Sequence, residues 1–219
     1  MQTLFSRSML IVLLVGLIIG AISLKASAAD YFPLKAGNCW IYYPSYGNGY
    51  RIDSIVGTEM VDTTLTYIWK RLEAPPDNYH ERRWLVKDGV DLKALQYWDN
   101  MQEPPLTEPL LLDPPWFLGN IDNPNVGDSW QIDLTSGASH ATVTFWVESI
   151  TATVTVPAGT FSGCVRVRQK DEITTGTSIK YNYKKYWLAP SVGTVMYKKF
   201  SRNWATGKKT QKLVAYSLE

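Results

Sequence analysis

Residues 141–170, ATVTFWVESITATVTVPAGTFSGCVRVRQK, alternate apolar and polar side chains on both sides of a short Pro-Ala-Gly segment. Alternation with a period of two is typical of a strand that buries one face. The same pattern, interrupted by Gly, Pro and Asn, recurs over most of the chain after residue 30. It predicts strands at 38–43, 49–57, 64–73, 80–87, 91–98, 128–134, 141–156, 160–170, 179–189, 193–201 and 209–217.

Most connections between these segments are short, and short connections favour antiparallel pairing because parallel pairing needs long crossovers. We therefore expect an all-β protein, a strongly curved antiparallel sheet or half-barrel of about ten strands. Two weakly similar halves build it, since Gly37–Tyr42 resembles Gly127–Ile132 and Trp84-Leu85 resembles Trp187-Leu188. The expected organisation is a signal peptide at 1–28 and one β domain at 29–219, with halves at 30–102 and 126–219.

Residues 103–125, between the halves, contain six of the twelve prolines. Proline donates no hydrogen bond to a sheet, so this segment is expected to be a linker and not a central strand. It is also apolar, which predicts that it covers an apolar surface. The candidate lid of a ligand cavity consists of Leu110, Leu111, Leu112, Trp116 and Phe117. The alternative is that these side chains are ordinary core, as strand aromatics usually are.

The first residues have the features of an export signal. Arg7 precedes seventeen uncharged residues, and Ala26-Ser27-Ala28 follows them closely, which is typical of a cleaved signal peptide. An uncleaved anchor is the alternative, because seventeen residues are near the lower limit for a membrane span. No cysteine precedes Cys39, so the cleavage site has no cysteine to carry a lipid anchor. We expect an exported protein, either periplasmic or secreted.

Three groups of residues carry a resemblance to a known family: Pro33-Leu34-x-x-Gly37-Asn38-x-Trp40-x-Tyr42, Val154–Phe161 with Cys164-Val165, and Tyr186–Val195. They resemble exported bacterial β-proteins, some called lipoproteins and some TapB-like, which are distantly similar to the periplasmic lipoprotein-carrier fold (LolA/LolB-like). The resemblance covers most of residues 31–200 and implies an open, curved half-barrel in the cell envelope. Its motifs are turns and aromatic anchors, so it implies no functional residue.

Cys39 and Cys164 are the two cysteines of the chain. An oxidising compartment favours a disulfide between them. A closed loop of that length would stabilise the fold by roughly 4–5 kcal/mol in the chain-entropy model. The alternative is two buried free thiols, which behave as small apolar side chains.

Charge is divided unevenly along the chain. Residues 165–219 hold twelve Lys or Arg and three Asp or Glu, whereas residues 30–164 hold eight and seventeen. Strand alternation suggests a candidate cationic face made by Arg166, Arg168, Lys170, Lys180 and Lys184. Such a face could attract anionic lipid headgroups or an acidic partner. The alternative is a solvated outer face that balances the acidic half of the same molecule.

The chain has nine Trp, thirteen Tyr and six Phe but two His, so it offers little for acid–base or metal chemistry. No common catalytic motif occurs in it. We therefore expect a non-catalytic envelope protein, without a cofactor or a nucleic-acid partner, that binds or carries an apolar or amphipathic ligand such as a lipid. One alternative is a structural or protein-interaction module with an envelope protein as partner. Another is carbohydrate binding on aromatic platforms.

Overall fold

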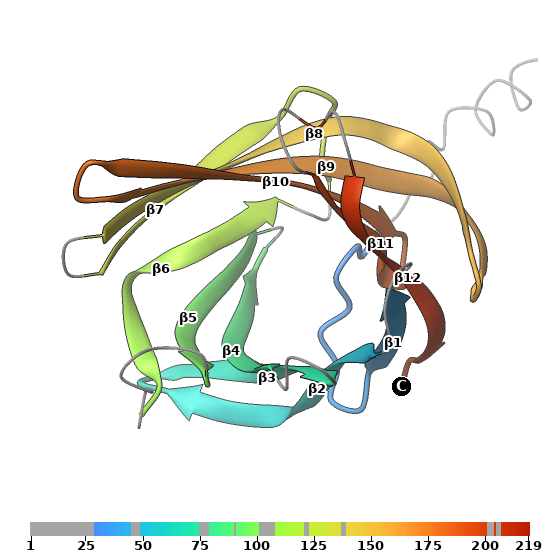
Figure 1. Ribbon diagram of the computed structural model, residues 1–219. Coiled ribbons are helices and arrows are strands. Elements are labelled where there is room, and N and C mark those ends of the chain that lie inside the picture. The colour runs from blue at the N-terminus through green and yellow to red at the C-terminus, as the bar shows by residue number, and fades with distance from the viewer. Residues whose placement is uncertain are drawn as a thin grey trace, which may run out of the picture.

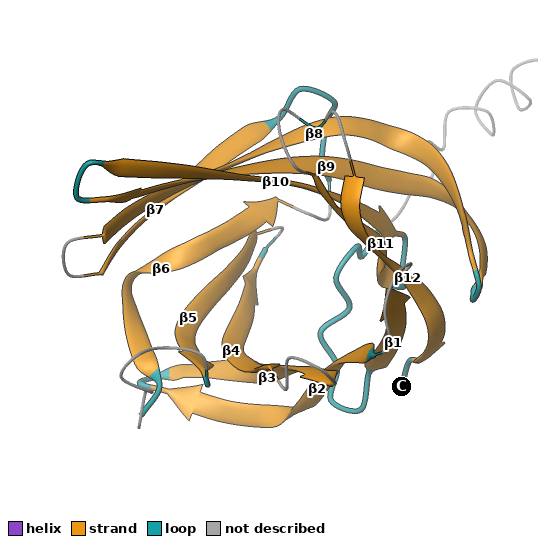
Figure 2. Cartoon of the chain, viewed as in Figure 1, coloured by secondary structure: helices purple, strands orange, loops and turns teal. Residues whose placement is uncertain are grey.

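In the computed structural model of the protein, residues 29–44, 49–74, 79–89, 91–100, 108–120, 123–136, 139–200, 204 and 207–219 are described. At 74, 79, 113–118, 120, 136, 139 and 208 the description covers the backbone alone. The expected signal peptide at 1–28 lies outside these residues. Within them, every regular element is a β-strand, which confirms the all-β class (Figures 1 and 2).

The described residues form twelve strands, more than the ten or so expected. They are β1 (Cys39–Pro44), β2 (Tyr50–Val61), β3 (Thr64–Ala74), β4 (Tyr79–Asp88), β5 (Asp91–Asp99), β6 (Leu110–Asn120), β7 (Ser129–Ser136), β8 (Ser139–Val156), β9 (Gly159–Thr175), β10 (Ser178–Ala189), β11 (Gly193–Phe200) and β12 (Gly207–Ser217). Each of these except β6 overlaps a strand that the alternation predicts.

The strands form one antiparallel sheet with the order β6-β5-β4-β3-β2-β1-β12-β11-β10-β9-β8-β7. Neighbours in the sheet are neighbours in sequence except where β1 pairs with β12 and joins the two ends of the described chain. The sheet curls so that β8–β10 lie across an interior from β2–β5 (Figure 1). Strands β6 and β7 are its two edges, so the half-barrel is open between them. The similarity of the two halves stays a prediction.

Strand β6 corrects the expectation for the proline-rich segment, because residues 110–120 are a strand and not a covering loop. Two features explain how prolines fit there. The strand is at an edge, so one of its sides needs no hydrogen-bond donors. Its pairing with β5 is also irregular, since Gln96 faces Leu111 while Ala94 faces Trp116. Pro114 and Pro115 fall inside this irregularity.

The main core takes buried side chains from β1 to β6 and from β8 to β12. Trp40 and Tyr42 of β1 are buried, and both anchor their polar atoms on the β10–β11 hairpin. Trp40 Nε1 donates to the Val192 carbonyl at 2.5 Å, and the Tyr42 hydroxyl donates to the Thr194 carbonyl at 2.8 Å. Because a buried indole or phenol needs a partner, these contacts fix the closure of β1 against β11.

The segment before β1 enters the interior of the half-barrel (Figure 1). Tyr31 and Phe32 pack against the core, and the Tyr31 hydroxyl donates to the Gly163 carbonyl at 3.1 Å. Asp30 accepts a hydrogen bond from Lys87 Nζ at 2.6 Å and its carbonyl accepts one from Ser191 N at 2.6 Å. Residues 30–34, and not the proline-rich segment, are therefore the part of the described chain that packs in the interior.

A prediction concerns Gly119, where β6 approaches the opposite edge. Its φ is +128°, and a Cβ built on it would lie 2.6 Å from Cζ2 of Trp130 in β7. Gly119→Ala should lower the free energy of unfolding by more than about 1 kcal/mol, because both the backbone and the contact exclude a side chain. Urea denaturation measures this. Gly57→Ala is the control, since a Cβ at Gly57 meets no atom within 4 Å. An equal loss in both variants would contradict the prediction.

The expected disulfide is absent, because Cys39 and Cys164 are both free. Cys164 is fully buried in the main core, and it lies on β9. Cys39 lies on β1 beside the buried Trp40, and successive side chains of a strand point to opposite faces. Strands β10, β11 and β12 separate the two positions in the sheet. The sequence distance between the cysteines says nothing about this placement.

Burial raises the pKa of both thiols, which disfavours the reactive thiolate in the native protein. In denaturant without a reductant, we expect alkylation of two cysteines per chain, measured by intact mass. Alkylation that requires prior reduction would show that the two cysteines pair in solution.

Candidate functional site

The concave side of the sheet contains a cavity of about 260 Å³. One wall comes from β2–β5 and the other from β7–β10, with Phe32 and Thr194 completing the lining. Since alternate residues of each strand share a face, the lining side chains follow a period of two along every strand. The cavity therefore belongs to the fold as a whole, and no single hairpin builds it.

The wall from β7–β10 is mainly apolar. Trp130 and Ile132 of β7, Phe145 of β8, Val167 of β9 and Leu188 of β10 line it. The Trp130 and Phe145 rings stack with their centroids 5.0 Å apart. An apolar ligand placed against this wall would leave water with a free-energy gain of about 25 cal/mol per Å².

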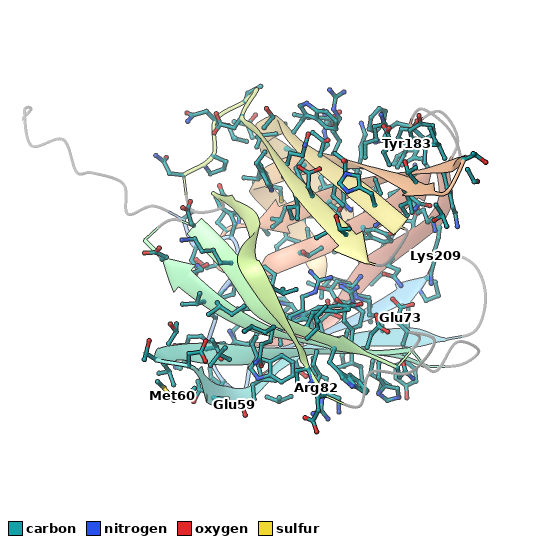
Figure 3. The ribbon with its side chains drawn as sticks, turned by 90° about the vertical axis from the view of Figure 1, so that its left-hand side faces the viewer. Glu59, Met60, Glu73, Arg82, Tyr183 and Lys209 are labelled. Carbon is teal, nitrogen blue, oxygen red and sulfur yellow. The ribbon has the colours of Figure 1, made fainter. Side chains whose placement is uncertain are left out.

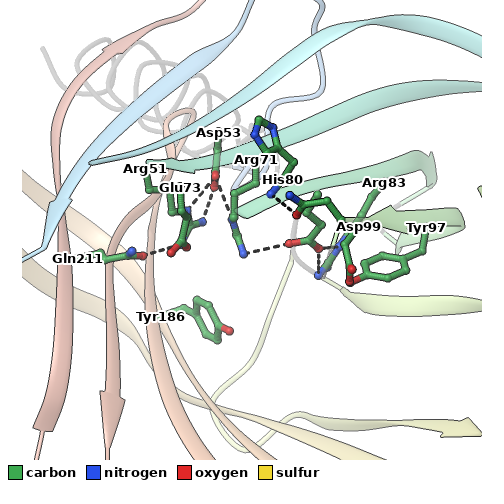
Figure 4. Close-up of polar contacts among 12 residues, drawn as sticks. Arg51, Asp53, Arg71, Glu73, His80, Arg83, Tyr97, Asp99, Tyr186 and Gln211 are labelled. Carbon is green, nitrogen blue, oxygen red and sulfur yellow. Dashed lines mark hydrogen bonds and ion pairs between the residues drawn. The ribbon is translucent and has the colours of Figure 1, made fainter. Parts of the chain in front are cut away.

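The opposite wall carries a row of alternating charges on three neighbouring strands (Figure 4). Arg51 donates to Asp53 through Nε at 2.8 Å and also through Nη2. Arg71 of β3 donates to Asp53 Oδ1 at 3.1 Å and to Glu81 Oε2 at 3.3 Å. Arg83 of β4 donates to Glu81 Oε1 at 2.5 Å. Each carboxylate is thereby shared by two guanidinium groups.

Burial and charge act in opposite directions on this row. Burial alone would raise the pKa of the Asp53 carboxyl, but Arg51 and Arg71 outweigh it, so the pKa is lowered. For Glu81 the same competition, with Arg83 and Arg71 as the cations, also ends in a lowered pKa. Burial would lower the pKa of Arg71, but Asp53 and Glu81 raise it. Asp53, Arg71 and Glu81 are therefore ionised at neutral pH.

Further contacts stabilise the row at Arg51 and beside it at Glu73. Arg51 Nη1 donates to Gln211 Oε1 of β12 at 2.9 Å, and its guanidinium lies 4.8 Å from the centre of the Tyr42 ring. Glu73, which is beside the row on β3, pairs with Lys209 of β12 at 3.4 Å (Figure 3). The row thus connects β2, β3 and β4 to β12 in addition to the sheet hydrogen bonds.

A smaller polar group faces the row from β9 and β10. The Tyr186 hydroxyl donates to Gln169 Oε1 at 2.7 Å, and Lys184 Nζ pairs with Asp171 Oδ2 at 2.7 Å. Burial raises the pKa of Tyr186, and Asp171 adds to that rise, while the three arginines of the row oppose it. The arginines across the cavity thus act electrostatically on the Tyr186 phenol, which stays protonated at neutral pH (Figure 4).

The candidate cationic face does not form as one surface. In the β9–β10 register, Lys184 lies opposite Gln169 and Lys185 lies opposite Arg168. Lys180 and Lys184 therefore share the inner side of the sheet with Gln169, whereas Arg166, Arg168 and Lys170 lie on the outer side. The strand alternation was identified correctly, but the sequence does not show how the registers of β9 and β10 combine.

The outer side chains Arg166, Arg168 and Lys170 contact acidic or aromatic side chains. Arg166 Nε lies 3.0 Å from Glu148 Oε2, and Lys170 Nζ lies 3.0 Å from Glu172 Oε2. Arg168 lies over the rings of Trp146 and Trp204, at 4.7 and 5.1 Å from their centres. These contacts favour the interpretation that the positive charges are balanced within the molecule.

The candidate lid residues are dispersed. Leu110 and Leu111 are exposed, Leu112 is buried in the core, and none of the three lines the cavity. For Trp116 and Phe117 the backbone positions in β6 are described, and their side chains lie outside the description.

The arginine–carboxylate row was missed by the sequence analysis, although a signal for it exists. Three consecutive strands each carry charges of opposite sign two residues apart: Arg51-x-Asp53, Arg71-x-Glu73 and Glu81-x-Arg83. Two residues apart in a strand means the same face. That signal does not reveal whether the face is inside or outside.

Comparison with known proteins identifies the fold. A candidate lipoprotein from Parabacteroides distasonis ATCC 8503 has a TM-score of 0.51 to this chain, 13% identity, and coverage of 87% of this chain and 99% of its own. A candidate exported protein with a YmcC-like fold from Bacteroides fragilis NCTC 9343 has a TM-score of 0.49, 14% identity, and coverage of 87% and 100%. No family model and no curated protein matches the sequence. The similarity to the Parabacteroides distasonis protein shows a shared fold and nothing further.

The described residues lack two further features. They contain no group of three or more His, Cys, Asp or Glu side chains placed to hold a metal ion. They also contain no helix that is long and apolar enough to cross a membrane.

Proposed function

We propose that this is an exported, non-catalytic protein that binds an apolar or amphipathic ligand in its concave cavity. The observation that carries the proposal is the pairing of an aromatic and aliphatic wall with an arginine-bearing wall around one space of about 260 Å³. Ligand sites are typically concave, mostly apolar, and supplied with a few polar groups that orient the ligand. The expected signal peptide, and the description of the Parabacteroides distasonis protein as a candidate lipoprotein, support export.

The size of the cavity limits the ligand. Sites for drug-sized molecules usually span about 300–1,000 Å³, and a cavity of about 150 Å³ already holds benzene. We therefore propose that the cavity takes one apolar chain or ring, and not a complete lipid with two acyl chains. Native mass spectrometry of the protein purified from its own envelope tests this directly. Retention of a small amphipathic molecule supports the proposal.

A matched pair of substitutions on β8 gives a further prediction. Val143 lines the cavity, and its neighbour Thr144 lies on the opposite face of the same strand. Val143→Trp should fill the cavity and weaken binding of an environment-sensitive naphthylamine probe by at least about tenfold, since roughly 1.4 kcal/mol of lost contact suffices. Thr144→Trp should leave the probe affinity unchanged. Fluorescence titration measures both, and equal affinities in the two variants would contradict the prediction.

A second candidate function rests on an outer aromatic patch near the β9–β10 turn. Tyr183 lies 4.6 Å from the Trp204 ring centre and 6.4 Å from Tyr181, and Trp146 contacts Trp204 at 6.3 Å. Tyr181 is exposed. Such a patch suits a protein-interaction module or a sugar platform. Loss of partner capture or glycan binding in Tyr181→Ala, with probe binding intact, would favour this function over the cavity.

A further inference from the structure

In the arginine–carboxylate row, the two carboxylates are more deeply buried than two of the arginines, Arg71 and Arg83, which lie at the cavity surface. The Asp53 and Glu81 side chains are 6% and 2% exposed, whereas those of Arg71 and Arg83 are 21% and 29% exposed. Among the described residues that line the cavity, three are arginines and one, Asp53, is a carboxylate. The surface that a ligand meets on this wall is therefore positive.

Hydrogen-bond donors remain on the two surface arginines. Arg51 uses Nε, Nη1 and Nη2 on Asp53 and Gln211. Arg71 uses Nε and Nη1, and Arg83 uses Nε and Nη2, all on Asp53 or Glu81. Within the described part of the chain, Arg71 Nη2 and Arg83 Nη1 have no side-chain acceptor. A guanidinium with an unused donor is suited to a carboxylate or phosphate oxygen.

The two guanidinium groups are held beside each other in advance. Glu81 bridges them, with Oε2 on Arg71 and Oε1 on Arg83. Both also lie on the Trp69 ring, at 4.6 and 5.4 Å from its centre. Because Glu81 and Trp69 fix the pair without a ligand, an incoming anion has little ordering entropy to overcome.

Three further described acidic groups near this wall have partners of their own. Glu73 pairs with Lys209, and Asp171 pairs with Lys184. Asp99, which lies opposite Glu81 in the β4–β5 register, accepts a hydrogen bond from the Tyr97 hydroxyl. Of the polar group on β9 and β10, the residues that line the cavity are the neutral Tyr186 and Gln169, which hydrogen-bond each other. A ligand with an anionic end and an apolar chain would therefore match both walls, while a cationic end would face Arg71 and Arg83.

We infer that the ligand of the cavity is an amphipathic anion whose carboxylate or phosphate group is bound by Arg71 and Arg83, with its chain on the Phe145 and Leu188 wall. This inference rests on the proposed function and adds the chemistry of the headgroup. The anionic group could belong to a lipid-like molecule with an apolar chain, or it could be a small free anion without a chain. The experiment has to distinguish these two kinds of ligand.

Isothermal titration calorimetry of the full mature chain with dodecanoate, dodecanol, dodecyltrimethylammonium and inorganic phosphate makes the separation. We expect dodecanoate to bind at least about tenfold more tightly than dodecanol, since a hydrogen bond to a charged group commonly contributes that factor. The cationic amphiphile should bind most weakly of the three chains. Phosphate alone should bind far more weakly than dodecanoate because it lacks the chain.

Arg83→Gln should remove the preference for dodecanoate and leave the affinity for dodecanol unchanged. Arg83 is the more exposed of the two surface arginines, so the variant is expected to fold, and its thermal transition checks this. Arg82→Gln is the matched control, because Arg82 is the adjacent residue, exposed on the opposite face of β4 and directed away from the interior (Figure 3). It should bind all four compounds as the parent protein does.

Each outcome is decisive. Equal binding of dodecanoate and dodecanol overturns the anion inference while the proposed function survives. Binding of phosphate as tightly as dodecanoate overturns the lipid-like source. Failure of every compound to bind overturns the proposed function together with the inference. A preference for dodecanoate that Arg83→Gln retains overturns the assignment of that residue.

Discussion

Asp53→Ala should destabilise the protein by about 3–5 kcal/mol, a loss large enough to unfold a marginal domain. Asp53 accepts hydrogen bonds from both Arg51 and Arg71, and Arg51 is 5% exposed. Removing the carboxylate leaves the Arg51 charge buried with Gln211 as its remaining hydrogen-bond acceptor. An uncompensated buried charge costs far more than a paired surface charge contributes. Urea denaturation at neutral pH measures the change.

Two companion variants make this result specific. Asp88→Ala removes a carboxylate that pairs with Lys93 at 2.7 Å but is largely exposed, so the urea midpoint should stay unchanged. Arg51→Met combined with Asp53→Ala removes the buried charge as well and should recover part of the lost stability. If the double variant is no more stable than Asp53→Ala alone, the buried arginine is not the cause of the loss.

Local features of the fold could be predicted from the sequence because each strand encodes its own alternation. The hairpin around Pro157 and Gly159 is an example, since the turn and both alternating flanks lie in one stretch of sequence. The pairing of β1 with β12 is different, because it joins segments about 170 residues apart through register contacts such as Trp40 with Tyr216. Nothing local specifies that partner, so the order of the sheet and its open edges needed the structure.

The same distinction explains what was missed at the site. Alternation shows that Arg71 and Glu73 share a face, but the row depends on register, which places Arg71 directly opposite Asp53 on one side and Glu81 on the other. Bulges shift that register at several strands, including β2 between Ile55 and Gly57. Proline content misled the analysis of β6 for a related reason, because an irregular edge strand tolerates residues that a central strand excludes.

Acid should destabilise the protein steeply, because the carboxylates of the arginine–carboxylate row have lowered pKa values in the folded state. The pKa values of Asp53 and Glu81 are lowered in the folded protein from their usual values of 3.8 and 4.5. The unfolded chain therefore takes up protons before the folded chain does as the pH falls. The stability that these two groups contribute is complete above about pH 5 and is lost as the pH falls through their folded pKa values. Urea midpoints measured from pH 7 to pH 2.5 should fall most in the acidic part of that range.

Glu81→Gln tests whether the row causes this dependence. The amide cannot ionise, so the variant should be less stable than the parent at pH 7, where Arg71 and Arg83 lose their shared carboxylate. It should also lose stability more gently on acidification, because one titrating group fewer reduces the limiting slope by up to about 1.4 kcal/mol per pH unit. The two stability curves should therefore converge at low pH, where the parent's Glu81 is itself protonated. Parallel curves down to pH 2.5 would mean that other carboxyl groups carry the acid sensitivity and that Glu81 does not titrate with a lowered pKa.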